Sequence, residues 1–345
     1  MLVAAAMIEG CSPHALLSAM GSSNYQRTND QAYGSDPRQK LDLYIPAQHV
    51  KNADVVIFLY GGRWRSGDKA DYRFVAEGLN ANGIITVIPN YRLYPQVDWK
   101  DFIADAGAVY HWVETHIAAY DGNPRRIFLM GHSAGAHIAA MVALDQTVRE
   151  HAGSHIPPCG MIGLAGPYDF LPFVDADVRQ VFGSAIHPME TQPIFYVDHS
   201  DPSLLLLSGA SDTTVKPQNS YRLADAMQKV GAKAEVIVYP GVAHTGFLVS
   251  LARPLQFIAP TLKDTTNFIH KTRCGSQTTV RSNLDGKLRR FFSAPAVQLI
   301  FLRIRWRSDS SRRIISSNKS DNARDCEPLG RIVLVPLIHG QELYK

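Results

Sequence analysis

Short apolar runs alternate with stretches of helical periodicity from about residue 40 to residue 271. The runs are rich in Val, Ile and Leu, which is typical of strands that are buried on both faces. We expect strands at 40–46, 54–60, 84–89, 126–131, 159–164, 203–208 and 234–239. We expect helices at 69–82, 99–120, 134–145, 217–231 and 256–271. This alternation predicts an α/β fold in which helices flank a mostly parallel central sheet.

The chain has 345 residues, enough for one large domain with an appendage. The alternation stops near residue 272, and the segment that follows holds 14 Lys and Arg against 6 Asp and Glu. We therefore expect an N-terminal segment and linker at 1–23, the main domain at 24–272 and a basic extension of low order at 273–345. Because the basic excess lies in that extension, the main domain lacks the basic stripe of a nucleic-acid-binding protein.

Ser133 lies in the turn Gly131-His132-Ser133-Ala134-Gly135, between a predicted strand and a predicted helix. A G-x-S-x-G turn at such a junction is a nucleophile elbow, because its small flanking residues let strand and helix approach closely. The turn raises the serine hydroxyl above the sheet. The helix aims its first amides at the same place, so the N–H of Ala134 is a candidate oxyanion donor.

A serine nucleophile needs a base and a carboxylate that orients the base. Asp212 follows a predicted strand in "LLLLSGASDTTV", and Asp169 and Asp201 are rival carboxylates. His244 follows the next predicted strand in "EVIVYPGVAHTGF" and is the candidate base. The chain order Ser133, Asp212, His244 is the order of the hydrolases that use a nucleophile elbow.

Two stretches contribute further candidate site residues. His132 and His137 flank the serine, and we expect them to pack the elbow or to line the pocket. In "FLYGGRW", Gly61 and Gly62 end a predicted strand, and without a Cβ they allow backbone amides to point into a pocket. We expect Trp64 and His132 to belong to the substrate pocket.

The motifs "YGGRW", "GHSAGAH", "GASDTTV" and "PGVAHTGF", with "YGSDPRQKLDLYIP" upstream, lie in this order over about residues 24 to 271. This set resembles the α/β-hydrolase esterases of the hormone-sensitive-lipase-like and BD-FAE-like branch, which is close to the bacterial carboxylesterases and the kynurenine formamidases. The resemblance implies an oxyanion hole of the Gly62, Arg63 and Ala134 amides, with Gly61 shaping the turn. Tyr60 is a departure, because these families usually carry histidine there in H-G-G.

The residues and the resemblance together predict a serine carboxylesterase that cleaves small acyl or aryl esters through an acyl-enzyme. We expect no metal and no organic cofactor, because the triad generates its own nucleophile. Residues 170–196 lie where such folds insert a cap over the pocket. An arylformamidase with the same triad is the alternative enzyme, and a non-catalytic hydrolase fold that acts as a binding module is the alternative of another class.

Four cysteines, Cys11, Cys159, Cys274 and Cys326, show neither a CxxC pair nor metal-ligand spacing, so we expect neither a zinc site nor a disulfide framework. Cys159 is expected to be buried as a small apolar side chain. The start "MLVAAAMIEGCSP" resembles a bacterial lipoprotein signal, although it lacks a basic segment and has Glu9 near the cysteine. If Cys11 is lipidated, we expect it to anchor the protein to a bacterial envelope membrane, with a location in the envelope or periplasm. Otherwise we expect a cytoplasmic protein.

Overall fold

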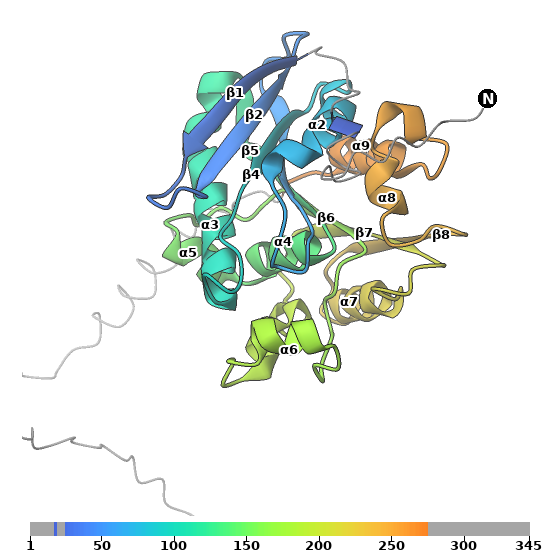
Figure 1. Ribbon diagram of the computed structural model, residues 1–345. Coiled ribbons are helices and arrows are strands. Elements are labelled where there is room, and N and C mark those ends of the chain that lie inside the picture. The colour runs from blue at the N-terminus through green and yellow to red at the C-terminus, as the bar shows by residue number, and fades with distance from the viewer. Residues whose placement is uncertain (1–16, 19–24, 275–345) are drawn as a thin grey trace, which may run out of the picture. The chain divides into compact units, whose positions relative to one another are not determined.

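A single eight-stranded sheet, in the order β1-β2-β4-β3-β5-β6-β7-β8, runs through the residues that the computed structural model describes, which are 17–18 and 25–274 (Figure 1). The strands are β1 (Tyr25–Ala32), β2 (Lys40–Pro46), β3 (Ala53–Leu59), β4 (Ile85–Pro89), β5 (Gly122–His132), β6 (Gly160–Leu164), β7 (Ser203–Gly209) and β8 (Ala234–Tyr239). β2 pairs antiparallel with both β1 and β4, and all later pairs are parallel. The predicted mostly parallel α/β sheet is confirmed.

Helices cover both faces of this sheet. α2 (Arg73–Asn80) contacts α9 (Thr261–Lys271) on one face, whereas α3 (Trp99–His116), α4 (Ala134–Leu144) and α5 (Gln146–His151) contact one another on the opposite face (Figure 1). The remaining helical elements are α6 (Ala176–Phe182), α7 (Gln218–Lys229), α8 (Gly246–Val249), and the 3-10 turns η1 (Lys69–Tyr72), η2 (Ile117–Tyr120), η3 (Pro188–Thr191), η4 (Pro193–Tyr196) and η5 (Arg253–Leu255). With both faces covered, the central strands are buried along almost their whole length.

The seven predicted strands are present, but β1 was not predicted. Its sequence, YQRTNDQA, carries no run of apolar side chains, and it pairs only with β2 at the edge of the sheet. The last helix begins at Thr261 rather than at 256, because Pro260 stands immediately before it and η5 precedes that proline. α5 and α6 were also missed, since each is too short to show two helical periods.

Cys159 and Cys274 form a disulfide, so the prediction that no cysteines pair is wrong for these two. Cys159 lies directly before β6 and is buried, as predicted, while Cys274 follows the end of α9. The partners stand 115 residues apart, and no local spacing signals such a bond. Arg126 of β5 strengthens the same junction by donating to the carbonyl oxygens of Ile269 and Thr272.

Two predictions fall on residues that the structure does not describe: the lipidation of Cys11 and the low order of nearly all of the segment 273–345. Both stay predictions. Among the described residues, none of the helices has the length and apolar character required to cross a bilayer. Within the same residues, no three His, Cys, Asp or Glu side chains gather as a metal site would require.

Candidate active site

The turn at Ser133 has the geometry that the G-x-S-x-G pattern predicted. Ser133 joins β5 to α4 with φ of 54° and ψ of −120°, a backbone conformation that side-chain-bearing residues rarely adopt. A Cβ on Gly131 would lie 2.3 Å from the carbonyl oxygen of Gly135, and a Cβ on Gly135 would lie 2.0 Å from that of Leu59. Both flanking glycines are therefore required for α4 to start this close to β3 and β5.

Ser133, His244 and Asp212 are joined by an unbroken chain of hydrogen bonds. The Ser133 hydroxyl donates to Nε2 of His244 over 2.9 Å, and Nδ1–H of His244 donates to Oδ2 of Asp212 over 2.8 Å. Asp212 lies in the loop after β7 and His244 in the loop after β8. Since β5, β7 and β8 run parallel, these loops meet at one edge of the sheet.

The Asp212 carboxylate is buried and fully occupied by donors. Its Oδ1 accepts from the backbone N–H groups of Thr214 and Val215, both over 2.9 Å. Burial by itself raises the pKa of Asp212, but the hydrogen bonds from His244 and from these two amides outweigh it and hold that pKa below its usual range. Asp212 is thus an ionised acceptor that keeps the proton of His244 on Nδ1.

Neither rival carboxylate reaches the histidine. Asp169 pairs with Arg222 of α7 over 3.0 Å. Asp201 accepts from the N–H of Asp198 over 2.8 Å in the loop before β7, at the end of that strand opposite to Asp212. Of the three candidate carboxylates, Asp212 is therefore the one that contacts His244.

His132 supports the loop of His244. Its Nε2 bonds the carbonyl oxygen of His244 over 2.9 Å, and the centroids of the two rings lie 4.9 Å apart. His132 is buried, yet it also lines the pocket, in agreement with its predicted place. His132 thus contacts the loop of His244 and lines the pocket, and its role toward a substrate stays a prediction.

The glycine loop, residues 60–67, stands beside the serine in a strained conformation. Gly62, Arg63 and Trp64 all have positive φ, of 118°, 54° and 59°. A Cβ on Gly62 would lie 2.1 Å from the carbonyl oxygen of Ser66, so no other residue fits there. Gly62, Arg63 and Ala134 line the same pocket as Ser133, and their backbone N–H groups are candidate oxyanion donors.

Tyr60, the departure from H-G-G, braces this loop from behind. Its ring stacks on Tyr72 and on Tyr91, with centroids 5.1 and 4.7 Å apart. Its hydroxyl donates to Oδ1 of Asn90 and accepts from the Arg38 guanidinium, both over 2.8 Å. Burial raises the pKa of Tyr60, which stays a neutral phenol. A tyrosine thus anchors the loop at a position where these families usually carry histidine.

A pocket of about 730 Å³ opens above Ser133. Its walls are mainly apolar and come from the glycine loop, from the loops of Asp212 and His244, and from the segment 170–196, which we call the cap segment. The cap residues that line it are Phe170, Pro172, Val174, Asp175 and Val178. The predicted placement of a cap over the pocket agrees with this lining.

Trp64 joins the glycine loop to α4 and to the cap segment. It is nearly buried, and its ring meets Phe182 edge to face at 4.7 Å between centroids. Its Nε1–H donates to Nδ1 of His137 over 3.2 Å, and Nε2–H of His137 donates to the carbonyl oxygen of Thr191 over 2.8 Å. Burial lowers the pKa of His137 to about 4, so this histidine stays neutral and keeps both hydrogen bonds.

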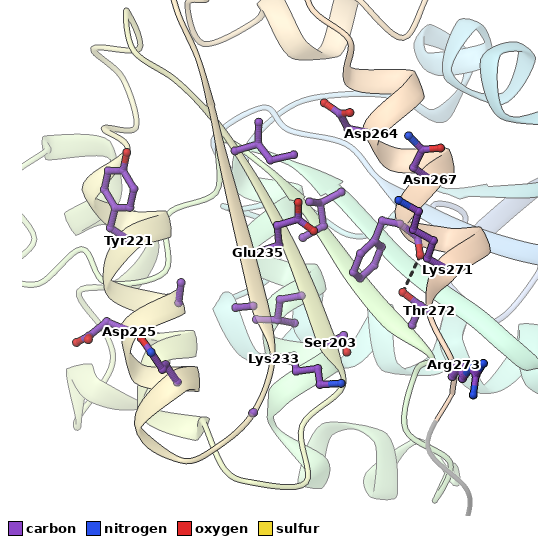
Figure 2. Close-up of a pocket in the computed structure, with 18 residues that line it drawn as sticks. Ser203, Tyr221, Asp225, Lys233, Glu235, Asp264, Asn267, Lys271, Thr272 and Arg273 are labelled. Carbon is purple, nitrogen blue, oxygen red and sulfur yellow. Dashed lines mark hydrogen bonds between the residues drawn. The ribbon is translucent and has the colours of Figure 1, made fainter.

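A second hollow, of about 930 Å³, lies between α7, β8 and α9 (Figure 2). Its polar lining includes Asp225, Lys233, Glu235, Asp264 and Lys271. Ser203 also lies there, but no histidine lines this hollow to act as a base. Of these two hollows, the pocket over Ser133 is thus the one that joins a serine to a histidine.

Comparison with known proteins identifies the family of the chain. The BD-FAE family matches residues 41–227, which is more than half of the chain. The chain belongs to the BD-FAE family. The predicted resemblance to the BD-FAE-like esterase branch is thereby confirmed.

Relatives of this BD-FAE protein are named esterases. An isoprenylcysteine alpha-carbonyl methylesterase of Arabidopsis thaliana is 35% identical over 62% of this chain and 55% of its own length. Esterase LipC of Mycobacterium tuberculosis is 26% identical over 68% of this chain and 64% of its own. The chain spans about half to three-fifths of the length of the plant relatives.

Solved structures confirm the fold. A carbohydrate esterase from gut microbiota superposes with a TM-score of 0.64 at 22% identity, over 72% of this chain and 97% of its own. Esterase 2 of Thermogutta terrifontis superposes with a TM-score of 0.61 at 24% identity, over 72% of this chain and 94% of its own. At such identities the likeness speaks for the α/β-hydrolase fold alone.

Sequence reasoning missed two features of this BD-FAE site. The hydrogen bonds of Tyr60 join it to Arg38 and Asn90, which lie in different loops. Arg38 belongs to the stretch "YGSDPRQKLDLYIP", but nothing in that stretch tells which side chain Arg38 contacts. The cap segment contributes Asp175 and Asp177, which bind the side chain of Arg63. The only sequence signal for the latter is an acidic pair at the start of a short helix, and such pairs are common.

Proposed function

We propose that this protein is a serine carboxylesterase that works through an acyl-enzyme. The observation that carries the proposal is the hydrogen-bond chain Ser133–His244–Asp212 at the floor of an apolar pocket. The esterase names of the relatives support the class of reaction. An intact triad also argues against a mere binding module, because such a module has no need of these three groups in register.

In the first half-reaction, Ser133 Oγ attacks the ester carbonyl carbon while its proton passes to Nε2 of His244. The imidazolium that forms is stabilised by the ionised Asp212. Collapse of the tetrahedral intermediate breaks the carbon–oxygen bond of the ester, and His244 returns the proton to the leaving alcohol. Water then repeats these steps on the acyl-enzyme, which releases the acid and restores Ser133.

The negative charge on the substrate oxygen needs donors that are already in place. The amides of Gly62, Arg63 and Ala134 are the proposed donors, since all three residues line the pocket beside Ser133. The first two belong to the strained glycine loop, and Ala134 opens α4, where the helix dipole adds a positive end. Backbone donors cannot be lost by a side-chain change, so the shape of the loop itself sets this part of the catalysis.

The substrate is proposed to be an ester with an apolar acyl or aryl group, because most of the pocket wall is apolar. The plant relatives favour one narrower candidate, the methyl ester of an S-prenylated cysteine, whose long apolar chain suits such a wall. An aryl formamide remains the alternative substrate, since the same triad cleaves it.

The test is labelling with a fluorophosphonate, which reacts only with an activated serine. Wild-type protein is expected to gain the mass of one phosphonyl group at Ser133, and Ser133→Ala is expected to gain none. Rates on a short-chain aryl ester, an S-prenylcysteine methyl ester and an aryl formamide then rank the substrates. Labelling that is equal in both proteins would contradict the proposed nucleophile.

We also propose that the protein matures in an oxidising compartment. The support is the disulfide between Cys159 and Cys274, since stable disulfides are rare in the cytosol of mesophiles. Envelope anchoring through lipidated Cys11 is consistent with such a compartment. Mass spectrometry of the protein purified from its native host decides both points, because a reduced pair and an unmodified Cys11 would exclude them.

A further inference from the structure

Two arginines of the glycine loop bind the helix of the cap segment. Arg63 Nη2 donates to Oδ1 of Asp175 over 2.5 Å, and its Nε donates to Oδ2 of Asp177 over 2.9 Å. Arg65 Nη1 donates to Oε1 of Gln180 over 2.6 Å. The partners stand at the start and along one side of α6, so charged and polar side chains join the loop to the helix across the rim of the pocket.

The ion pairs of Arg63 with Asp175 and Asp177 lie at the strained part of the glycine loop. Three consecutive residues with positive φ persist only where surrounding contacts hold them. Trp64 supplies such a contact on the buried side, through His137 and Phe182. On the outer side the side chain of Arg63 is bound by the two aspartates, and this guanidinium lowers the pKa of Asp175.

We infer that Asp175 and Asp177 are positioning residues, which hold Arg63 so that the amides of the glycine loop keep their place beside Ser133. This inference rests on the proposed esterase function. The cap segment would then do two things, because it lines the substrate pocket and also fixes the oxyanion loop.

The expected loss in turnover on removing these ion pairs is small, because the paired side chains are exposed to solvent. The side chains of Arg63, Asp175 and Asp177 are 45%, 49% and 47% exposed, so solvent screens their attraction. Such pairs add little to global stability. We therefore expect a loss in turnover of about threefold to fivefold rather than a collapse of the fold.

The test compares the double variant Asp175→Asn/Asp177→Asn with the wild type on a neutral aryl butyrate. Asparagine at 175 keeps the oxygen Oδ1, which caps α6 by accepting from the N–H of Asp177 and Val178 and also accepts from Arg63. The variant therefore removes the negative charges that face Arg63 and preserves the cap. We expect kcat and kcat/KM to fall together by about threefold to fivefold at low salt, with KM unchanged, as for an interaction felt in the transition state. Salt should lower the wild-type rate to that of the variant.

Three controls make the result decisive. Asp225→Asn removes the same charge from an exposed ion pair with Lys229 on α7 and should match the wild type at every salt concentration. Arg63→Met removes the hydrogen bonds as well as the charge attraction, so it should cost at least as much as the double variant, and combining all three changes should cost no more than Arg63→Met alone. Hydrogen exchange of the amides at 60–67 should be faster in the double variant, which is a readout that needs no catalysis.

The inference is overturned if the double variant keeps wild-type turnover and salt dependence, or if exchange at 60–67 does not change. If the double variant fails to fold, the salt dependence of the wild type and the turnover of Arg63→Met carry the test. Failure of the proposed function is a separate result: Ser133→Ala would then be as active as the wild type, whatever the aspartates do.

Discussion

At the scale of single residues, hydrogen bonds fix the orientation of the Asp212 and His244 side chains before a substrate binds. Asp212 receives three donors, two of them backbone amides, and so can neither turn nor easily take a proton. His244 is consequently left with Nε2 directed at Ser133. The order of motifs in the sequence predicted these three residues, but only the fold shows that Asp169 and Asp201 are engaged elsewhere.

The first prediction concerns the triad. Ser133→Ala is expected to lower kcat by about 10⁶, and Asp212→Asn by about 10⁴, because the asparagine no longer fixes the histidine tautomer. Ester hydrolysis by folded variants measures both losses. Asp169→Asn and Asp201→Asn serve as matched controls and should stay near wild-type turnover. A fully active Asp212→Asn would show that another carboxylate orients His244.

A second prediction at this scale follows from Asp201. Burial, together with the nearby charge of Asp198, raises the pKa of Asp201 to about 7, well above its unfolded value. The folded state therefore holds this proton more tightly, and its stabilising contribution is lost as the pH rises from about 4 through about 7. Asp201→Asn should become more stable than the wild type at pH 8, in urea unfolding, and show no such gain at pH 4. An equal difference at both pH values would contradict the shift.

At the scale of elements, the glycine loop is held at three places: by Tyr60 from behind, by Trp64 from the buried side and by Arg63 from the rim. A loop with consecutive positive φ values needs such support, because isolated it would relax to ordinary backbone geometry. Tyr60 places two hydrogen bonds and two stacked rings at the rear of the loop.

The third prediction tests this brace. Tyr60→Phe keeps both ring stacks but removes the hydroxyl from Arg38 and Asn90, so the free energy of unfolding should fall by about 1–2 kcal/mol. Turnover should fall several-fold because the loop loses its rear support. Tyr33→Phe is the matched control, since its hydroxyl bonds only the carbonyl oxygen of Asn90. We expect the control to lose stability and to keep kcat; equal turnover in both variants would argue against the brace.

The same elements show how far the sequence alone could lead. Buried strands and the elbow were predictable, because burial on both faces and a turn between two close-packed glycines leave little choice of residue. β1 was not predictable, since its exposed polar sequence takes its conformation from β2. The bonds of Trp64 to His137, and of Arg63 to Asp175, join segments about 70 and 110 residues apart, and no local pattern encodes such pairs.

At the scale of the whole molecule, the described part of the chain finishes with α9 and with the disulfide that follows it. Among the described residues, α9 is the last element, and the sequence pattern had placed the predicted boundary just after it, at residue 272. The disulfide lies two residues beyond it and ties Cys274 to the start of β6 in the middle of the sheet. The last helix is thus held by its apolar face, by Arg126 and by a covalent bond.

The last prediction uses this bond to locate the functional C-terminus of the domain. A chain that ends at Cys274 should match the full-length protein in turnover, because the triad, the pocket and the disulfide are all retained. A chain that ends at Thr272 keeps the same sheet and triad but loses the cross-link over 115 residues. For a loop of that length the chain-entropy argument gives a ceiling of about 4–5 kcal/mol in the free energy of unfolding.

Urea unfolding with and without reductant distinguishes the contribution of the disulfide from that of the residues after Thr272. The chain ending at Cys274 should have a lower free energy of unfolding in reductant than without it. Two proteins that lack the disulfide should have this lower free energy of unfolding with or without reductant: the chain ending at Thr272 and a Cys159→Ala/Cys274→Ala variant. Turnover at low temperature should remain within a few-fold in all of them, since none of the changes touches the pocket over Ser133. If reductant leaves the chain ending at Cys274 unchanged, the disulfide does not stabilise the fold in solution. If that chain folds but is inactive, the segment beyond 274 contributes to the active site.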